Sequence, residues 1–274
     1  MNLAPLLAAG VVLNGVAAIL AFRRRSVDLG GALAGTVLGA AIFGFGGPLF
    51  WVVLMAFFVT STAAGQVRHR EKEWLSTIHQ KGERRDLFQV LANGGLGAIT
   101  SILFYSTGRP AWAAAFAVSF AASNADTWAS EIGVLSRSTP VTLFSLRPVP
   151  RGISGGVTVA GSLAAVAGAL LIGLVFALEN LAMGILPGGV VRILLFVGAG
   201  GGVGSFVDSV LGATVQARYA SNDAPGVLTE RRLDASGARN PLVRGLPFVN
   251  NDAVNFLSGI ITTGLAAAAA PLVF

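Results

Sequence analysis

Long apolar stretches alternate with short polar segments along the whole chain. The fourth of these stretches is the weakest, because Asn93-Gly94-Gly95 interrupts it. Each stretch is long enough to cross about 30 Å of hydrocarbon as a helix. The pattern therefore predicts an all-α, polytopic membrane protein with about eight transmembrane helices, or seven as the alternative. The spans lie near residues 3–22, 28–44, 47–65, 88–105, 110–133, 155–178, 190–216 and 248–272.

The composition supports this interpretation. Of the 274 residues, 54% are hydrophobic and 12% are charged, whereas soluble domains carry about 25% charged residues. The chain has no cysteine, which excludes disulfide bonds and thiolate metal sites. The net charge of +6 is explained by charges on the loops and gives no reason to expect a nucleic acid partner. We expect one integral membrane domain over residues 1–274.

The basic residues lie on alternate loops. All of the 19 lysines and arginines except Arg109 and Arg192 lie directly after the first span or in the loops near 66–87, 134–153 and 217–247. Because basic loops stay in the cytoplasm, these loops are predicted to be cytoplasmic and both termini to lie outside. The first cluster of arginines follows the first apolar run, an order that favours a retained helix over a cleaved signal peptide.

Acidic residues occur near the predicted cytoplasmic ends of three spans. Asp126 lies in a Ser-x-x-Asp-Thr sequence, Asp208 lies in the similar Ser-x-x-Asp-Ser, and Asp252 opens the last span. Carboxylates at membrane depth are costly and are rarely kept without a function. The predicted topology places all three on one face of the membrane at one depth. We therefore expect them to lie together, with a purely structural role as the alternative.

This group of carboxylates predicts a metal site. Oxygen ligands suit hard cations, and Mg²⁺ typically binds one or two carboxylates together with substrate phosphates. Glu131 follows Asp126 by five residues, about 140° around an ideal helix, so it faces the same site only if the helix frays there. A structural role for Glu131 stays open. The metal candidates are Asp126, Glu131, Asp208 and Asp252, and the catalytic candidates are Asp126, Asp208 and Asp252.

Basic and neutral polar residues near the same face are candidates for binding phosphates. Residues 148–156 form a Gly-rich turn that runs into a helix start, where exposed backbone amides bind anions, and loop arginines can bind phosphate oxygens. The glycines of 198–204 are interpreted as a helix-packing surface, and His69 and His79 as solvated loop residues. The candidates for binding nucleotide or phosphate are Asn93, Asn124, Arg147, Arg151, Ser154, Gly155, Gly156, Ser205, Ser209, Gln216, Asn251 and Asn255.

Five motifs occur in an order that resembles a known membrane family. Together they resemble the integral membrane family that includes the plant phytyl-phosphate kinase of the vitamin E pathway, and they are distantly similar to CTP-dependent polyprenol kinases and phosphatidate cytidylyltransferase. The resemblance covers most of the chain from about residue 84 onward. One departure is Ile153, where the family's turn is expected to carry Thr. The motifs span residues 85–94, 123–133, 150–157, 204–216 and 251–258.

The resemblance implies phosphoryl transfer from a nucleoside triphosphate, with CTP as donor, to an isoprenoid monophosphate such as phytyl or geranylgeranyl phosphate. This acceptor is largely ionised at neutral pH and needs no general base, which agrees with the absence of histidine from the predicted spans. The implied cofactor is Mg²⁺, with the active site on the cytoplasmic face of a prokaryotic cell membrane. The alternative is an ion-coupled transporter, since intramembrane acids and a repeated motif are also typical of carriers. The oligomeric state stays open.

Overall fold

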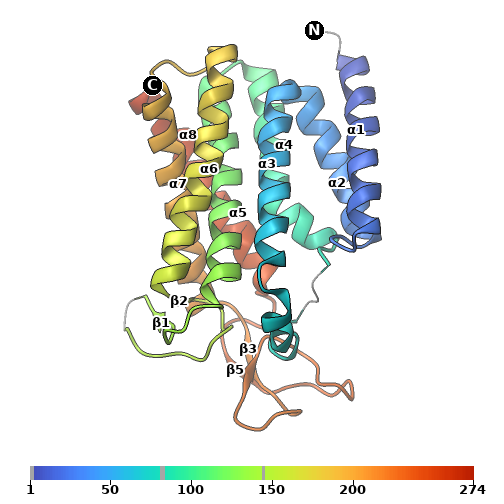
Figure 1. The fold of residues 1–274 in the computed structure, drawn as a ribbon, viewed down its shortest axis with the longest axis vertical. Coiled ribbons are helices and arrows are strands. Elements are labelled where there is room, and N and C mark those ends of the chain that lie inside the picture. Colours follow the sequence, from blue (N-terminus) through green and yellow to red (C-terminus); the bar gives the residue numbers. More distant parts are fainter. Residues whose placement is uncertain (1–2, 81–83, 144–145) are drawn as a thin grey trace.

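The computed structural model describes residues 3–80, 84–143 and 146–274. Residues 81–83 and 144–145, which fall within the predicted loops 66–87 and 134–153, lie outside the described residues. The fold is a bundle of long helices with a few short strands at one end (Figure 1). The α-helices are α1 (Leu3–Arg23), α2 (Leu29–Ala41), α3 (Gly47–Gln66), α4 (Leu87–Thr107), α5 (Pro110–Gly133), α6 (Val159–Met183), α7 (Val190–Thr214) and α8 (Asn251–Val273).

The remaining elements are short. A π-helix, η1 (Ile42–Gly46), joins α2 to α3, and a 3₁₀ helix, η2 (His69–Thr77), follows α3. Two antiparallel sheets lie in the loops, one with the strand order β1-β2 and one with the order β4-β3-β5. The strands are β1 (Val141–Thr142), β2 (Gly156–Val157), β3 (Arg218–Ala220), β4 (Leu228–Thr229) and β5 (Leu242–Arg244).

The helices coincide with the predicted spans, so the all-α architecture is confirmed. Among the described residues, six stretches are long and apolar enough to cross a membrane, and one of them, Leu29–Gln66, contains both α2 and α3. Gly47, with a φ of 79°, separates these two helices. The number of crossings and the side that each terminus faces remain predictions.

Helix α5 is not among the six apolar stretches, and its position explains why. It packs against α3, α4, α6, α7 and α8, and every residue from Ala113 to Ala122 is buried. A helix that is surrounded by other helices needs no lipid-facing apolar surface, so it can carry serine, asparagine and aspartate within a membrane protein. The surrounding helices therefore allow α5 to carry polar side chains inside the bundle.

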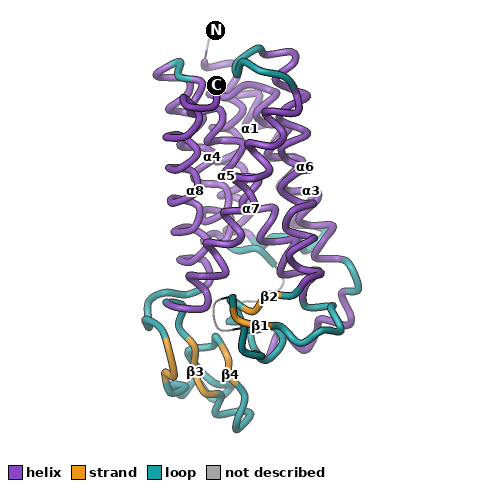
Figure 2. Tube along the Cα trace, turned by 90° about the vertical axis from the view of Figure 1, so that its left-hand side faces the viewer, coloured by secondary structure: helices purple, strands orange, loops and turns teal. Residues whose placement is uncertain are grey.

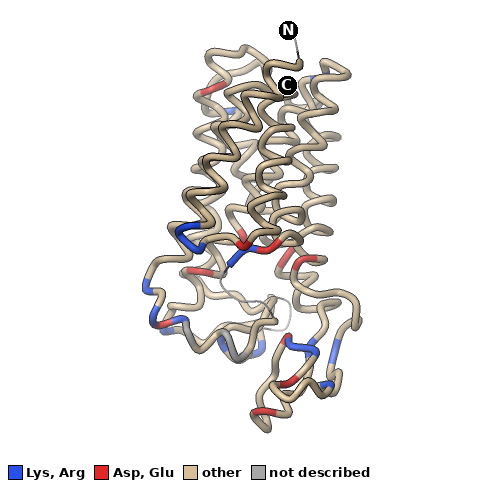
Figure 3. Tube along the Cα trace, turned by 90° about the vertical axis from the view of Figure 1, so that its right-hand side faces the viewer, with Lys and Arg blue, Asp and Glu red and all other residues tan. Residues whose placement is uncertain are grey.

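The two ends of the bundle differ. Both termini lie at one end (Figure 1). At the other end α1, α3, α5 and α7 finish and α2, α4, α6 and α8 begin, and we call it the loop end. The strands and the longest loops gather there (Figure 2), as do most of the charged residues (Figure 3). This asymmetry is the structural counterpart of the alternating basic loops in the sequence.

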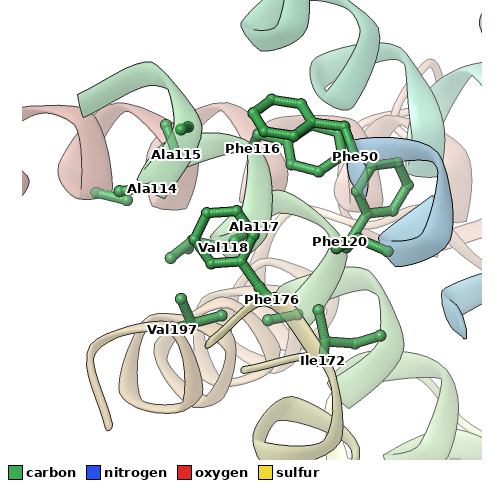
Figure 4. Close-up of a cluster of buried hydrophobic side chains, with 14 of the residues drawn as sticks. Phe50, Ala114, Ala115, Phe116, Ala117, Val118, Phe120, Ile172, Phe176 and Val197 are labelled. Carbon is green, nitrogen blue, oxygen red and sulfur yellow. The ribbon is translucent and has the colours of Figure 1, made fainter. Parts of the chain in front are cut away.

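Aromatic rings and small residues form the apolar core around α5 (Figure 4). Phe50 of α3 stacks on Phe116 of α5 with ring centroids 4.2 Å apart, and Phe120 meets Phe116 edge-on at 5.1 Å. On α7, a side chain at Gly201 would lie 2.8 Å from the β-carbons of Ala121 and Ala169. Gly198, Gly200, Gly201 and Gly204 therefore serve helix packing, as predicted for this segment, whereas Gly202 has no neighbour within 4 Å of an added β-carbon.

Helix α4 is continuous through Asn93-Gly94-Gly95, which corrects the predicted interruption. An interior glycine costs a helix about 1 kcal/mol relative to alanine, but this cost is offset by close packing. A β-carbon at Gly94 would lie 3.2 Å from the Leu38 side chain, and one at Gly97 would collide with the Phe120 ring. The helix also has a capping box, in which Asp86 accepts from the Gln89 amide at 2.9 Å and Gln89 accepts from the Asp86 amide at 3.1 Å.

Candidate functional site

A cavity of about 850 Å³ lies at the loop end of the bundle. The last turns of α3, α5 and α7 and the first turns of α4, α6 and α8 contribute to its walls, and the loops around residues 69–85, 140–157 and 216–232 complete them. Segments that are far apart in the sequence thus meet around one space. Because α4, α6 and α8 begin here, the positive ends of their dipoles point toward the cavity and favour anions.

Two carboxylates form the centre of the site. Asp126 of α5 and Asp208 of α7 line the cavity, and their side chains are close enough to interact directly with each other. We call them the acid pair. Within the described parts of the chain, no lysine or arginine forms an ion pair with either acid. Since adjacent carboxylates repel each other unless a proton or cation lies between them, the acid pair favours binding of a cation.

Neutral donors from α8 orient one member of the acid pair. The Ser258 hydroxyl donates to Asp208 Oδ2 at 3.1 Å. With its nitrogen turned toward α7, the Asn255 amide donates to the same oxygen at 3.0 Å and to the Asn251 carbonyl oxygen at 3.2 Å. These contacts hold Asp208 Oδ2 in place, so α8 acts as a support for the acid pair.

Asp252 lies on the wall of the same cavity. It is buried in the first turn of α8, where a negative charge is stabilised by the helix dipole, and Asn250 caps this helix by accepting from the Ala253 amide at 3.0 Å. The structure therefore brings Asp126, Asp208 and Asp252 to one cavity. In the part of the chain that is described, however, no three acidic or histidine side chains converge to hold one metal ion. A metal here would be held by the acid pair, with substrate oxygens completing its coordination.

Glu131 is part of a separate ion pair. Its carboxylate lies 2.6 Å from Lys72 Nζ, and the lysine side chain is only 7% exposed. Lys72 also donates to the Gly65 carbonyl at 2.8 Å, which ties η2 to the ends of α3 and α5. Glu131 lines the same cavity as Asp126 although α5 remains helical through Gly133, so fraying is not needed, but its carboxylate is already paired with Lys72. This arrangement favours the structural role for Glu131.

The Gly-rich turn lines the cavity and is fixed by residues that follow α7. Gln216 Nε2 donates to the Ser154 hydroxyl at 3.0 Å, and this hydroxyl donates to Glu230. Arg218 donates to the Ser154 carbonyl and, at 2.9 Å, to the Gly212 carbonyl. Burial, and then the nearby Arg244, lower the pKa of Arg218, while Glu230 opposes this effect. Arg218 is thus a buried structural cation.

Gly155 is required in this turn for two reasons. Its φ is +77°, and a β-carbon there would collide with the backbone of Ala213 at the end of α7. The turn does not lead directly into a helix, which corrects the sequence prediction. Gly156 belongs to β2 and pairs with Thr142, and α6 starts only after Thr158, whose hydroxyl accepts from the Gly161 amide at 3.0 Å. The first turn of α6 nevertheless faces the cavity.

The structure separates the twelve phosphate-binding candidates into two groups. Asn124 is fully buried away from the cavity, where it accepts from Thr60 at 3.0 Å and donates to the Gly168 carbonyl at 2.9 Å. Arg147 and Arg151 are exposed and do not line the cavity, and Arg151 donates to the Arg137 carbonyl at 2.7 Å. These three are not brought to the site. Those that line it are Asn93, Ser154, Gly155, Gly156, Ser205, Ser209, Gln216, Asn251 and Asn255.

Arg85 is a cavity residue that the sequence analysis did not select. It donates to the Ser61 hydroxyl at 3.0 Å, and its guanidinium lies 5.9 Å from the centroid of the Phe57 ring. Burial lowers the pKa of Arg85, while the Glu131 carboxylate opposes this effect. The guanidinium still carries its charge at neutral pH. The available signal was its place at the start of the first family motif, directly before α4.

Several other cavity residues were also missed. Glu230 is buried and lines the cavity together with Arg25 and Arg232. His69 and His79, which were expected to be solvated, line it as well. His79 Nε2 lies 2.9 Å from the Gly152 carbonyl oxygen. The cavity therefore offers cationic groups for phosphates beside a carboxylate pair for a metal ion.

Comparison with known proteins gives the family. A family of proteins described as "Integral membrane protein DUF92" matches residues 12–263, and no solved structure matches the chain. Protein PGR of Arabidopsis thaliana is 30% identical over 96% of both chains. An uncharacterized membrane protein of Methanocaldococcus jannaschii is 30% identical over 76% of this chain and 82% of its own.

A further relative is similar over a smaller part of the chain. Protein VTE6, chloroplastic, of Arabidopsis thaliana is 29% identical over 58% of this chain and 45% of its own length. These matches confirm the family resemblance that the five motifs predicted, and they agree with the helical bundle and its apolar surface. The chain therefore belongs to the integral membrane protein family DUF92.

Proposed function

We propose that the protein transfers a phosphoryl group from a nucleoside triphosphate, with CTP as donor, to an isoprenoid monophosphate such as phytyl or geranylgeranyl phosphate. The observation that carries the proposal is the acid pair, which lies in a cavity at the loop end of an otherwise apolar bundle. The similarity to Protein VTE6 and the resemblance to the family of the plant phytyl-phosphate kinase support this class of reaction.

The residues of the site fit Mg²⁺, which would be held by Asp126 and Asp208. Two adjacent, partly buried carboxylates without a cationic partner in the described structure are suited to a hard divalent ion. When bound, Mg²⁺ would neutralise charge on the donor phosphates. Ser258 and Asn255 keep Asp208 in position through their contacts with Oδ2. Asp252, on the wall of the same cavity, adds negative charge on the α8 side.

The acceptor phosphate is the nucleophile in this proposal. One of its oxygens forms a bond to the terminal phosphorus of the donor as the bridging oxygen of the donor leaves, which produces the prenyl diphosphate and a nucleoside diphosphate. Because the acceptor oxygen already carries negative charge, the site needs no group to remove a proton. The work of the protein is positioning and charge neutralisation, for which Arg85 and the first turns of α4, α6 and α8 are suitably placed.

The transporter alternative fits the structure less well. A carrier requires its site to be reached from both sides of the membrane, whereas the cavity described here lies at one end of the bundle. The core between the cavity and the termini is filled by the aromatic cluster of Phe50, Phe116, Phe120 and Phe176 (Figure 4). This packing favours chemistry at one face over passage through the bundle.

Incubation of the purified protein in detergent with geranylgeranyl phosphate, Mg²⁺ and CTP labelled in its terminal phosphate is expected to give labelled geranylgeranyl diphosphate. The reaction should stop when EDTA removes the metal, because the charge of the donor phosphates would then not be neutralised. Thin-layer chromatography of the lipid product measures the result. The proposed kinase function is contradicted if no nucleotide supports diphosphate formation with any C15–C20 prenyl phosphate. If proteoliposomes then show substrate flux, the transporter is the correct function.

A further inference from the structure

Partly exposed residues of α6 and α7 form one side of the cavity wall. Val166 of α6 and Phe206 of α7 both line the cavity, and their side chains are 51% and 49% exposed at the protein surface. Exposed residues in the wall of a cavity mark a place where it can open to the side. Gly202 also lines the cavity, and it lies one turn before Phe206 on the same face of α7. A β-carbon added to Gly202 meets no atom within 4 Å.

Helix contacts limit this opening to the loop-end half of α6 and α7. Toward the termini, α6 and α7 pack closely, since a side chain at Gly173 would lie 2.9 Å from the Leu194 carbonyl oxygen and one at Gly201 would lie 2.8 Å from Ala169. The opening therefore begins below the contact at Gly201. Asp208 lies one turn after Ser205 on α7, and both residues line the cavity beside Phe206, so the opening adjoins the acid pair. By contrast, α4 and α8 are in close contact, because a side chain at Gly259 would lie 2.8 Å from Leu96.

The opening faces hydrocarbon. Both α6 and α7 are long and apolar enough to cross a membrane, and the rim consists of an aliphatic residue, a glycine and an aromatic residue. An apolar chain in this opening would avoid water along its whole length, while a phosphate at its end would reach the cationic cavity. A water-soluble ligand would have to cross hydrocarbon to reach the cavity through this opening. The ligand that fits both the apolar opening and the cationic cavity is a lipid with a terminal phosphate.

We propose that the gap between α6 and α7, rimmed by Val166, Gly202 and Phe206, is the portal through which the prenyl chain of a lipid phosphate enters the site. The first isoprene units stay in the portal while the phosphate lies beside the acid pair. This inference rests on the proposed function and adds to it the path of the substrate and the residues that contact its chain. Val166 and Phe206 are then determinants of specificity for chain length and branching.

A bulky side chain at Gly202 tests the portal. The measured quantity is the ratio of kcat/KM for geranylgeranyl phosphate (C20) to that for dimethylallyl phosphate (C5), whose chain is too short to extend through the opening. In Gly202→Phe this ratio is expected to fall about tenfold or more, the effect of losing a few methylene contacts. The matched control is Val203→Phe on the next, lipid-facing position of α7 (45% exposed), for which the ratio should not change. An unchanged ratio in Gly202→Phe overturns the portal.

Photocrosslinking of the wild-type protein gives a second test that does not depend on turnover. A geranylgeranyl phosphate analogue with a diazirine on its prenyl chain, irradiated with the protein in nanodiscs, should label peptides around Val166 and Phe206. Unlabelled geranylgeranyl phosphate should compete, whereas phosphatidylcholine should not. Labelling confined to other helices, or equal competition by phosphatidylcholine, overturns the portal. Specific labelling of α6 and α7 without any turnover would keep the portal and refute the kinase function instead.

Discussion

Asp126→Asn and Asp208→Asn are each expected to lower kcat by about 10²–10³, the cost of losing one electrostatic contact to a charged transition state. Asparagine keeps the shape of the side chain but removes charge that, in the proposed function, would bind a cation. Because the two acids are adjacent, the variants should fold as well as the wild type, since the repulsion between the carboxylates is removed. Rates under saturating substrates and thermal unfolding in detergent measure both effects.

The control for these variants is Glu179→Gln. Glu179 is also an acid in a membrane-spanning helix, but it lies near the end of α6 that is closer to the termini and does not line the cavity. Its replacement should leave turnover near the wild-type rate. Turnover close to that of the wild type in either aspartate variant would remove that residue from the site. An equal loss in all three would point to a general effect of intramembrane acids on folding.

Arg85→Met is expected to lower kcat/KM by about tenfold to hundredfold. A hydrogen bond to a charged group contributes about 1.5–3 kcal/mol, and Arg85 is the half-buried cation on the cavity wall whose guanidinium is held by Ser61 and Phe57. Arg85→Lys should restore part of the loss, since it keeps the charge but not the planar pair of donors. Steady-state kinetics with varied prenyl phosphate and varied CTP would show which phosphate the residue contacts.

Two other arginines separate this role from a general effect of positive charge. Arg151, which the sequence suggested as a phosphate ligand, does not line the cavity and donates to the Arg137 carbonyl, so Arg151→Met should have a smaller effect than Arg85→Met. Arg192 lies in the first turn of α7 at the opposite end of the bundle, and Arg192→Met should not change the kinetics. A larger loss of kcat/KM in Arg151→Met than in Arg85→Met would contradict the assignment of Arg85 and favour Arg151, the residue predicted from the sequence, as the phosphate ligand.

The spans could be predicted because the length of an apolar run is a local property of the sequence. Each predicted span overlaps one of the observed helices, and even α5, which is too polar to be recognised by hydropathy alone, was found from the apolar residues before its acidic end. The error in α4 has a different origin. A glycine weakens an isolated helix, but whether Gly94 and Gly97 break the helix depends on partners such as Leu38 and Phe120, which sequence reasoning could not place.

The acids of the site were found for a similar reason, since a carboxylate within an apolar run is unusual whatever its neighbours are. The arginines were harder, because in a membrane protein every cytoplasmic arginine also determines topology. Only the structure shows that Arg85 faces the cavity and that Arg151 does not. The Gly-rich turn depends on contacts from residues about sixty positions away, such as Gln216 and Arg218, and no local pattern reveals them.

The most direct test of the account is the binding of a divalent cation by the acid pair. Mn²⁺ can replace Mg²⁺ and be titrated into the protein by electron paramagnetic resonance, in the presence of geranylgeranyl phosphate and a non-hydrolysable analogue of CTP. We expect saturable binding to the wild type and to Glu179→Gln, and an affinity that falls about tenfold or more in both Asp126→Asn and Asp208→Asn. Equal Mn²⁺ affinity in the wild type and the two aspartate variants would contradict the account.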